Sequence, residues 1–413
     1  MTMDTLAPLG QPPASDQSPR FRQKRDLILD AAATLINERG LKGLTFVAVA
    51  EAVGLNTTSV TYYFKRKELL AAAAIERTID MLASLLDEAQ AQPTPEARVR
   101  QFLKAYLVQA GTARLGQARP MTILSDMRAM EDPQRARLTE AYVHRIARGA
   151  ARLFGDAADP LNRARAHILL DSLFWSRAWL AKYSVGDYER IGRKLMQLFD
   201  HGILPEGTGW KVAAPPRDPV PEDAEITPET YLRVATRLIN ERGYRGASVE
   251  RIAGELNVSK GSFYHHLQGK DDLVLECFQR SYGRFSQAQR RAINLPGTHR
   301  DRLAAVLGDL LDIQFDASFP LVRITALQAL PTDLRRIVLA RSDRMATRFA
   351  GMISDGIEEG SIRPLDPLIA SQWVTGLINS AHDMRLWAAE QPSRSEAVAL
   401  YAHPIAHGLF APR

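Results

Sequence analysis

The sequence predicts an all-α protein made of two tandem units, and three observations support this prediction. Apolar residues recur at helical spacing along much of the chain, whereas the alternating pattern of strands is nearly absent. A stretch of roughly forty residues occurs a second time, without a gap, half a chain length later. A proline-rich segment without helical periodicity lies between the two copies.

The composition is that of a globular protein with a mild excess of basic residues. The 413 residues are 46% hydrophobic and 24% charged, and the formal net charge of +6 hints at a polyanionic partner. The single cysteine, Cys277, excludes an intramolecular disulfide and a cysteine-rich zinc site. No run reaches the ~18 apolar residues of a membrane helix, and the N-terminus does not read as a secretory signal. We therefore expect a cytoplasmic protein without a membrane partner.

The repeat is clearest in the hexapeptide LINERG, which occurs at Leu35–Gly40 and again at Leu238–Gly243. Identical residues recur at the same shift of 203 positions: Gly43 and Gly246, Ala50 and Ala253, Ser59 and Ser262, Lys67 and Lys270, Leu70 and Leu273. The ends of the units match as well, because HGIL at His201–Leu204 resembles HGLF at His407–Phe410. Each unit therefore spans about 200 residues.

These landmarks divide the chain into six predicted segments. Residues 1–19 are rich in proline, and we expect a disordered arm there. Residues 205–226 form a linker that is long enough for the two units to pack side by side. The other four segments are helical domains: 20–80 and 81–204 in the first unit, 227–284 and 285–413 in the second.

Each unit opens with an amphipathic helix that ends near the hexapeptide. Gly40 and Gly243 stand where a glycine C-cap closes such a helix, because a left-handed residue costs glycine nothing. Thr45 and Ser248 follow, and threonine and serine are preferred N-cap residues. A second helix therefore begins at each of these positions.

The next twenty positions of each unit fit a helix-turn-helix. Residues 45–64 read TFVAVAEAVGLNTTSVTYYF, and residues 248–267 read SVERIAGELNVSKGSFYHHL. Ala50 and Ala253 are small where two helices must approach closely, and four residues later Gly54 and Asn257 suit a turn with positive φ. The helix that follows can enter the major groove of DNA with its N-terminal side chains toward the bases. The alternative, an ordinary amphipathic helix pair, is disfavoured because the spacing occurs twice.

Both segments resemble the N-terminal DNA-binding domain of TetR/AcrR-family transcriptional regulators. The family pattern ends in a tyrosine or histidine next to phenylalanine, followed by a lysine–acid–leucine motif that opens the fourth helix. SKGSFYHHLQGKDDLV at 259–274 matches it closely, and NTTSVTYYFKRKELL at 56–70 matches it with departures. Thr61 stands where the family usually has tyrosine, and Leu267 stands where it usually has phenylalanine.

The resemblance implies two TetR-like units that contact a double-stranded DNA operator. The implied contacts in the first unit are Thr57, Thr58, Thr61, Tyr62, Tyr63 and Lys67, and those in the second are Lys260, Gly261, Ser262, Tyr264, His265 and Lys270. Lys67 and Lys270 have the firmest basis, because a lysine at the start of a helix has no obvious role in a core. Tyr63 either contacts DNA or packs against the first helix. Neighbouring His265 and His266 diverge on a helix, so we expect no metal there.

Basic residues are unevenly distributed between the two helix-turn-helix domains. Residues 20–70 contain nine basic and five acidic residues, whereas residues 226–275 contain seven and six. Arg20, Arg22, Lys24 and Arg25 form a basic start to the first domain, which either reaches an adjacent DNA groove or is simply solvated. The second domain has no such start, so we expect its binding to DNA to be weaker or to depend on the neighbouring domain.

The resemblance further implies that the C-terminal part of each unit binds an unknown small effector and that its last two helices mediate dimerisation. Pro160 and Pro367 each precede a long helix of this kind. Aromatic and methionine side chains there either line an effector pocket or pack in the core: Phe102, Tyr106, Met121, Trp175, Phe315, Phe319 and Trp373. The tryptophans of the penultimate helices are open to a third interpretation, a four-helix interface: Trp175, Trp179, Trp373 and Trp387.

The sequence thus predicts a ligand-responsive transcriptional regulator, acting as a repressor, that reads an operator through two non-identical helix-turn-helix domains. The two units pair within one chain as a pseudo-dimer, or two chains form a homodimer. The alternative function is an effector-binding or partner-sequestering module in which one or both DNA-binding domains have degenerated. Catalytic motifs such as GxSxG and HExxH are absent from the sequence, so we expect neither an enzyme nor a cofactor.

Overall fold

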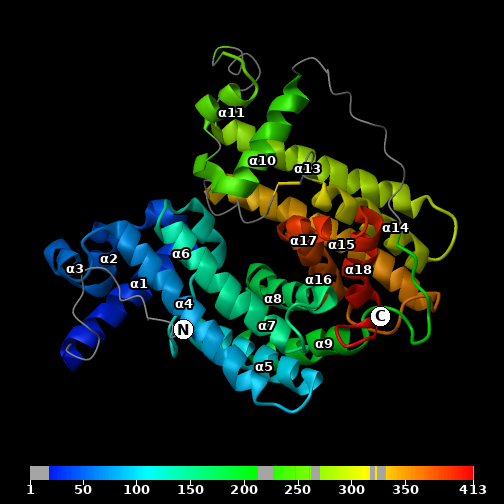
Figure 1. Cartoon of the computed structure of the whole chain (residues 1–413), viewed down its shortest axis with the longest axis horizontal. Coiled ribbons are helices and arrows are strands. Elements are labelled where there is room, and N and C mark those ends of the chain that lie inside the picture. The colour runs from blue at the N-terminus through cyan, green and yellow to red at the C-terminus, as the bar shows by residue number, and fades with distance from the viewer. Residues whose placement is uncertain are drawn as a thin grey trace.

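The computed structural model describes residues 18–212, 227–246, 248–259, 261, 270–316, 321–322 and 332–412. Within these ranges the chain is helical and contains no β-strand, which confirms the predicted all-α class (Figure 1). None of the helices in the described ranges is long and apolar enough to cross a membrane. In Figure 1 the first unit runs from blue to green and the second from green to red.

The first unit consists of a helix-turn-helix domain followed by a helical domain. Its helices are α1 (Pro19–Gly43), α2 (Phe46–Val53), α3 (Thr57–Tyr63), α4 (Lys67–Gln90), α5 (Pro95–Arg114), η2 (Leu124–Ala129), α6 (Gln134–Ala141), the π-helix η3 (Tyr142–Ala147), α7 (Arg148–Arg152), α8 (Pro160–Leu180), η4 (Val185–Asp187) and α9 (Tyr188–His201). Gly40 has φ 65° and interrupts α1, as the predicted glycine cap requires.

The second unit repeats this order. Its described helices are α10 (Pro228–Gly246), α11 (Val249–Glu255), α13 (Lys270–Ile293), α14 (His299–Phe315), α15 (Thr332–Glu358), α16 (Pro367–Ser380), η6 (Ala381–Met384), α17 (Arg385–Ala389) and α18 (Arg394–His407). Helix α10 continues through Gly243 to Gly246, so the helix end expected at Gly243 is wrong by three residues. Such offsets are common because helix ends fray.

The two units share one hydrophobic core, which crosses a bundle of four helices. Helices α8 and α9 of the first unit pack against α16 and α18 of the second (Figure 1). The indole Nε1 of Trp373 donates to Ser172 Oγ at 2.8 Å, and that of Trp387 donates to the Pro160 carbonyl at 3.0 Å. Buried apolar residues from both units belong to the same cluster. The interface is therefore an interior of the molecule rather than a contact between independent bodies.

At the end of this bundle the two repeated HG segments pair with each other. The backbone N–H of Ile203 donates to the carbonyl of Ile405 at 3.1 Å, and that of Leu409 donates to the carbonyl of Phe199 at 2.6 Å. Positions 203 and 409 are 206 residues apart, as are 199 and 405. The same bond is thus made in both directions, which is the mark of a two-fold relation between the units.

The glycines of these segments are required by the same contact. A Cβ atom on Gly202 would lie 2.2 Å from the Ala406 carbonyl oxygen, and one on Gly408 would lie 2.6 Å from the Asp200 carbonyl oxygen. Both glycines also have positive φ, at 63° and 93°. Only glycine satisfies both requirements, which explains why glycine stands at the end of both units.

The hexapeptide asparagines attach each helix-turn-helix domain to its helical domain. Asn37 Nδ2 donates to the Met121 carbonyl at 2.8 Å, and its Oδ1 accepts from the Ile123 N–H at 2.9 Å. In the second unit Asn240 Nδ2 donates to the Leu321 carbonyl, also at 2.8 Å. The asparagine of LINERG therefore has the same structural role in both copies.

A hydroxyl on the fourth helix of each unit completes this attachment. Thr78 Oγ1 accepts from the Thr122 N–H at 2.8 Å, and Ser281 Oγ accepts from the Val322 N–H at 2.9 Å. Thr78 and Ser281 are again 203 residues apart. Because the first and fourth helices both hold this segment, the orientation of the DNA-binding domain depends on buried polar contacts.

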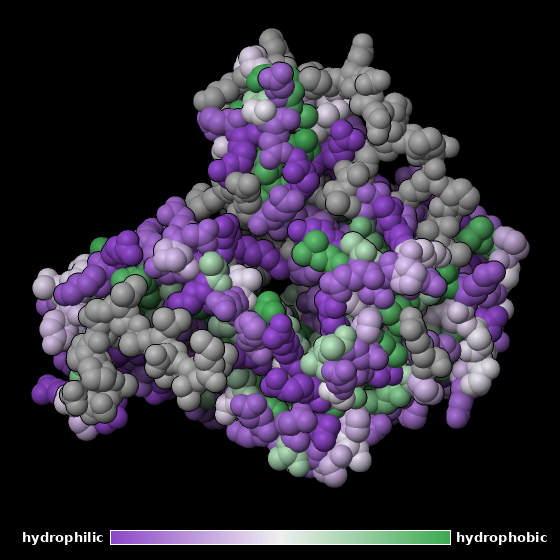
Figure 2. Space-filling view, viewed as in Figure 1, coloured by the Kyte–Doolittle hydropathy of each residue, from purple (hydrophilic) through white to green (hydrophobic). Residues whose placement is uncertain are grey.

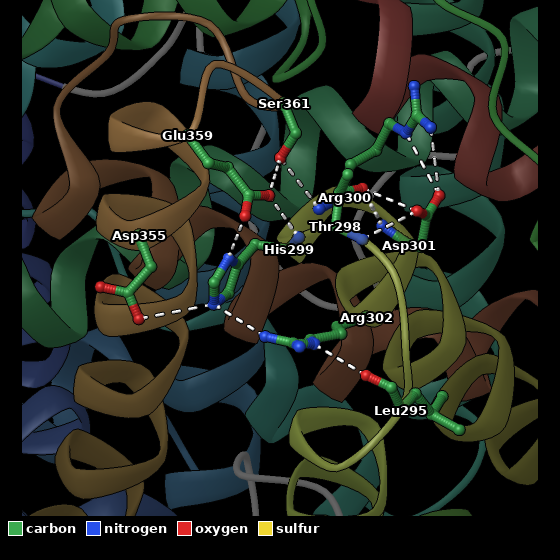
Figure 3. A network of polar contacts seen from close by, with 9 residues as sticks. All are labelled: Leu295, Thr298, His299, Arg300, Asp301, Arg302, Asp355, Glu359 and Ser361. Atoms are coloured by element: carbon green, nitrogen blue, oxygen red, sulfur yellow. Dashed lines mark hydrogen bonds and ion pairs between the residues drawn. The ribbon is translucent and has the colours of Figure 1, made fainter.

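A polar network closes the start of α14 against the end of α15 (Figure 3). His299 Nδ1 lies 2.8 Å from Glu359 Oε2, and its Nε2 lies 3.6 Å from Asp355 Oδ2. Glu359 also accepts from the Ser361 hydroxyl and from the His299 backbone N–H. These donors, the Ser361 hydroxyl most strongly, lower the pKa of Glu359 to about 2.

We expect Gly202→Ala to lower the free energy of unfolding by roughly 3 kcal/mol, because the methyl group both strains the backbone and meets the Ala406 carbonyl. Gly207→Ala is the matched control, since Gly207 has φ 73° but nothing within 4 Å of its Cβ position, and should cost only about 1 kcal/mol. Urea unfolding measures both. Equal losses would show that the inter-unit contact contributes nothing beyond backbone strain.

We expect Asn37→Ala to lower the free energy of unfolding by about 2 kcal/mol, because the Ile123 N–H loses its acceptor in a partly buried site. Thr34→Ala on the same helix is the control: its exposed hydroxyl donates only to the Asp30 carbonyl, so its effect should stay within about 0.5 kcal/mol. Urea unfolding followed by circular dichroism compares the two, and an Asn37→Ala variant as stable as the control would contradict the assigned role.

The lowered pKa of Glu359 makes its contribution to stability dependent on pH. The carboxylate stabilises the fold above its unfolded pKa of about 4.3, and this contribution disappears as the pH falls toward about 2. The stability difference between wild type and Glu359→Gln should therefore be present at pH 7 and vanish on acidification. Thermal unfolding across this range tests it, with the neighbouring Glu358→Gln as control. A difference that is independent of pH would refute the assignment.

Candidate nucleic-acid interface

The first helix-turn-helix is built by local caps and a tight turn. Thr45 Oγ1 accepts from the Ala48 N–H at 3.1 Å and begins α2, and Asn56 Oδ1 accepts from the Ser59 N–H at 2.7 Å and begins α3. Between them Gly54 adopts the left-handed conformation, with φ 65° and ψ 33°. Ala50 is buried at the crossing of the two helices. All of these features agree with the sequence-based assignment.

The predicted contact residues of the first unit lie on and just after α3. Thr57, Thr58 and Tyr62 are exposed, Tyr62 to 67% of its area, whereas Thr61, Tyr63 and Lys67 are partly covered. Thr61 Oγ1 donates to the Thr58 carbonyl at 2.9 Å, so this hydroxyl already has a partner within the helix. Lys67 is the first residue of α4. The exposed surface of α3 is thus formed by hydroxyl groups and one aromatic ring.

Phe21 at the start of α1 connects that helix to the exposed end of α3. Its ring lies 4.6 Å from the ring of Tyr63 and 6.1 Å from that of Tyr62. Tyr63 therefore packs against the first helix, which was one of its two expected roles. Phe21 was not identified from the sequence, because a single aromatic residue near a helix start carries no periodic signal.

The basic residues at the start of the first domain differ in their exposure and contacts. Arg20 and Arg22 are exposed, whereas the Arg25 guanidinium lies 5.4 Å from the centre of the Phe64 ring. Burial lowers the pKa of Arg25, although the group keeps its charge at neutral pH. Arg25 therefore joins α1 to the C-cap of α3, and Arg20 and Arg22 remain available to a polyanion.

The described part of the second helix-turn-helix repeats the first. Ser248 Oγ accepts from the Arg251 N–H at 3.3 Å and begins α11, and Asn257 has a φ of 53°, as expected for the turn. The Val258 N–H donates to the Ala253 carbonyl at 2.9 Å, the same bond that Leu55 makes to Ala50. Gly261 is exposed. The other predicted contacts lie outside the described residues or, for Lys270, have no described side chain: Lys260, Ser262, Tyr264, His265 and Lys270.

The residues proposed for an effector pocket are mostly packed in the core. Phe102 and Tyr106 are buried on α5, and the Tyr106 hydroxyl donates to the Leu173 carbonyl at 3.0 Å. Met121 is buried beside the asparagine contact, and Phe315 lies 5.7 Å from the Tyr401 ring. Phe319 lies outside the described residues.

Two of the tryptophans lie between the units rather than around a cavity. Trp373 bonds Ser172 across the bundle, and the Trp175 ring covers Gly376, whose Cβ would lie 2.5 Å from it. Trp179 is buried, and Trp387 reaches the start of α8. Cys277 is also buried, which raises the pKa of its thiol to about 12 and makes it a poor nucleophile.

Two cavities occur elsewhere in the molecule. One, of about 770 Å³, is bordered by α1, α2 and the segment after α5. The other, of about 270 Å³, lies between α13 and α15. Neither is lined by the aromatic residues that the sequence suggested.

Sequence comparisons match the duplicated region twice. The profile of bacterial regulatory proteins of the tetR family matches residues 28–74 and again residues 232–277. A second profile, the tetracyclin repressor-like C-terminal domain, matches residues 296–383. The two family matches coincide with the two helix-turn-helix domains described above.

Two curated proteins and one solved structure are similar to parts of this chain. The fatty acid metabolism regulator protein of Bacillus subtilis is 25% identical over 154 residues, which are 36% of this chain and 79% of the relative. The transcriptional repressor NemR of Escherichia coli is 26% identical over 137 residues, or 32% of this chain and 68% of the relative. The crystal structure of AibR in complex with isovaleryl coenzyme A and operator DNA covers 43% of this chain and 96% of AibR, with 21% identity and a TM-score of 0.35.

The duplicated match, the family C-terminal domain and the all-helical fold lead to one conclusion. Regulators of this family bind DNA and respond to small ligands, and they are not enzymes. The chain carries two DNA-binding domains of the tetR family of bacterial regulatory proteins in tandem, and the second is followed by a tetracyclin repressor-like C-terminal domain.

Proposed function

We propose that one chain is a complete repressor, in which the two units pair as the two subunits of a dimer would. The observation that carries this proposal is the reciprocal contact of the HG segments. Ile203 bonds to Ile405 and Leu409 bonds to Phe199 through equivalent atoms, as in an isologous interface. A contact of this kind normally joins two chains; here both halves belong to one.

The arrangement of the bundle also favours pairing within the chain. Helices α8, α9, α16 and α18 bury their apolar faces against one another, so the surface that a chain homodimer would use is already occupied. Figure 1 shows α1–α3 and α10–α11 at two separate corners of the molecule, away from the end of the bundle where α9 meets α18. Both DNA-binding domains are thus outside the interface that holds the units together.

The two domains differ in the residues that face DNA, so we propose that they read an asymmetric operator. The first presents Thr57, Thr58 and Tyr62, with Lys67 at the phosphate backbone, whereas the positions of the second unit that correspond to Thr57 and Thr58 are Lys260 and Gly261. Bound to DNA, the protein would occlude the promoter. An effector in the helical domains would release it by changing the spacing of the domains from the required ~34–36 Å.

A second candidate function is sequestration of an effector or protein partner without DNA binding. The observation in its favour is the balance of seven basic and six acidic residues in residues 226–275. A domain with so little excess positive charge gains little from the release of counterions.

Mass photometry and footprinting on the same operator fragment distinguish these functions. We expect one 45.9 kDa chain per operator and a protected site without palindromic symmetry. Lys67→Ala should weaken binding and reduce the slope of log affinity against log salt by about 1, because one phosphate contact is lost. Lys104→Ala, on α5, is the control and should change neither. A palindromic site bound by two chains would refute the pseudo-dimer, and affinity insensitive to salt would favour sequestration.

A further inference from the structure

The cavity between α13 and α15 is lined by an unusual number of arginines. Arg290 comes from α13, and Arg341, Arg344 and Arg348 come from α15. The three arginines of α15 are spaced i, i+3 and i+7, so they lie on one face of the helix. The cavity has a volume of about 270 Å³. We call this feature the arginine cleft.

The four arginines have no acidic partner among the described residues. None of them forms an ion pair there, and the nearest acid in the sequence of α15, Asp343, is held by Lys182 of the first unit at 2.7 Å. A guanidinium group stays charged at any physiological pH. Four such groups around one cavity, of which Arg290, Arg344 and Arg348 are exposed, create a positive potential that attracts an anion.

The first unit has carboxylates at positions where the second unit has none. There Arg137 pairs with Glu76 and Arg145 pairs with Asp80, so the cations on α6 and η3 are neutralised by carboxylates on α4. At the 203-residue shift, Glu76 corresponds to Gln279 and Asp80 to Gly283, and both of these residues line the arginine cleft. A third acid, Asp87, corresponds to Arg290. The second unit therefore has no carboxylate at any of these three positions.

The arginines of α15 lie beside two of these positions. Arg341 and Arg348 line the cavity together with Gln279 and Gly283. The carboxylates that neutralise cations at these two positions of the first unit, Glu76 and Asp80, are therefore missing beside the arginines of α15.

We propose that the arginine cleft binds the pyrophosphate group of a small ligand. Arg341 and Arg348 are separated by roughly 10 Å along the helix axis, which suits two linked phosphates better than one. Arginine binds phosphate oxygens in a bidentate manner, and the cleft offers four guanidinium groups. Its volume lies just below the ~300–1,000 Å³ of typical ligand pockets, so it holds the charged group while the rest of the ligand extends outside.

The test is to restore the carboxylates of the first unit. In the double variant Gln279→Glu, Gly283→Asp the arginines gain the partners that Arg137 and Arg145 have. A Cβ on Gly283 meets nothing within 4 Å, so the substitution fits the fold. The matched control is Gly283→Ala, which adds the Cβ without the charge.

Isothermal titration of the full chain with inorganic pyrophosphate measures the effect. We expect one site per chain, binding of orthophosphate at least about tenfold weaker, and a loss of at least about tenfold in the double variant but not in Gly283→Ala. Competition by ADP distinguishes a nucleotide pyrophosphate from the free ion. Equal affinity in the double variant and the control would overturn the proposal, as would equal affinity for orthophosphate and pyrophosphate.

DNA is the other polyanion in this system, and a parallel titration with operator duplex separates the two. Arg344→Gln with Arg348→Gln should abolish pyrophosphate binding and leave the salt dependence of DNA binding unchanged. Should these variants instead reduce the salt slope for DNA while pyrophosphate fails to bind the wild type, the cleft would hold the DNA backbone and the proposal would be wrong. Because DNA binding is read separately, failure of the repressor proposal would not affect this result.

Discussion

The reciprocal contact between the two HG segments is the constraint on which the rest of the molecule depends. Gly202 approaches the Ala406 carbonyl and Gly408 approaches the Asp200 carbonyl, so the ends of α9 and α18 meet in a reciprocal, two-fold contact. That contact fixes how α8 packs on α16, and hence where each DNA-binding domain lies. A close backbone contact tolerates little displacement of either helix, since the interior is packed as densely as a crystal.

The position of each DNA-binding domain then follows from a second repeated device. Asn37 and Thr78, or Asn240 and Ser281, hold the segment that follows the fifth helix of the unit. These are buried polar contacts, whose loss costs more than their formation gains. A change in the helical domain that moved this segment would therefore be felt by α1 and α4 together, which gives effector binding a physical route to the DNA-binding surface.

Joining two units in one chain removes the requirement that they be identical. In a homodimer Glu76 and Asp80 would occur twice, whereas here the second unit has Gln279 and Gly283 at these positions. The helix-turn-helix sequences have diverged in the same way, with Thr57 and Thr58 in one and Lys260 and Gly261 in the other. The bundle differs between its two sides as well, since Trp373 of one unit packs on Ser172 of the other and Trp175 covers Gly376.

The sequence alone determined the features that rest on local interactions: the two units, the caps at Thr45 and Ser248, and the turns at Gly54 and Asn257. Each depends on residues only a few positions apart, so the sequence pattern predicts it without knowledge of the tertiary structure. Contacts between distant residues, such as Phe21 with Tyr63, Trp373 with Ser172 and Arg128 with Asp383, had no such signal. For the same reason the sequence left open whether Trp373 lines a pocket, forms a four-helix interface or packs in the core, and the structure places it between the units. Only the tertiary structure decided these long-range contacts, because the burial of a side chain and its choice of partner depend on how whole helices pack.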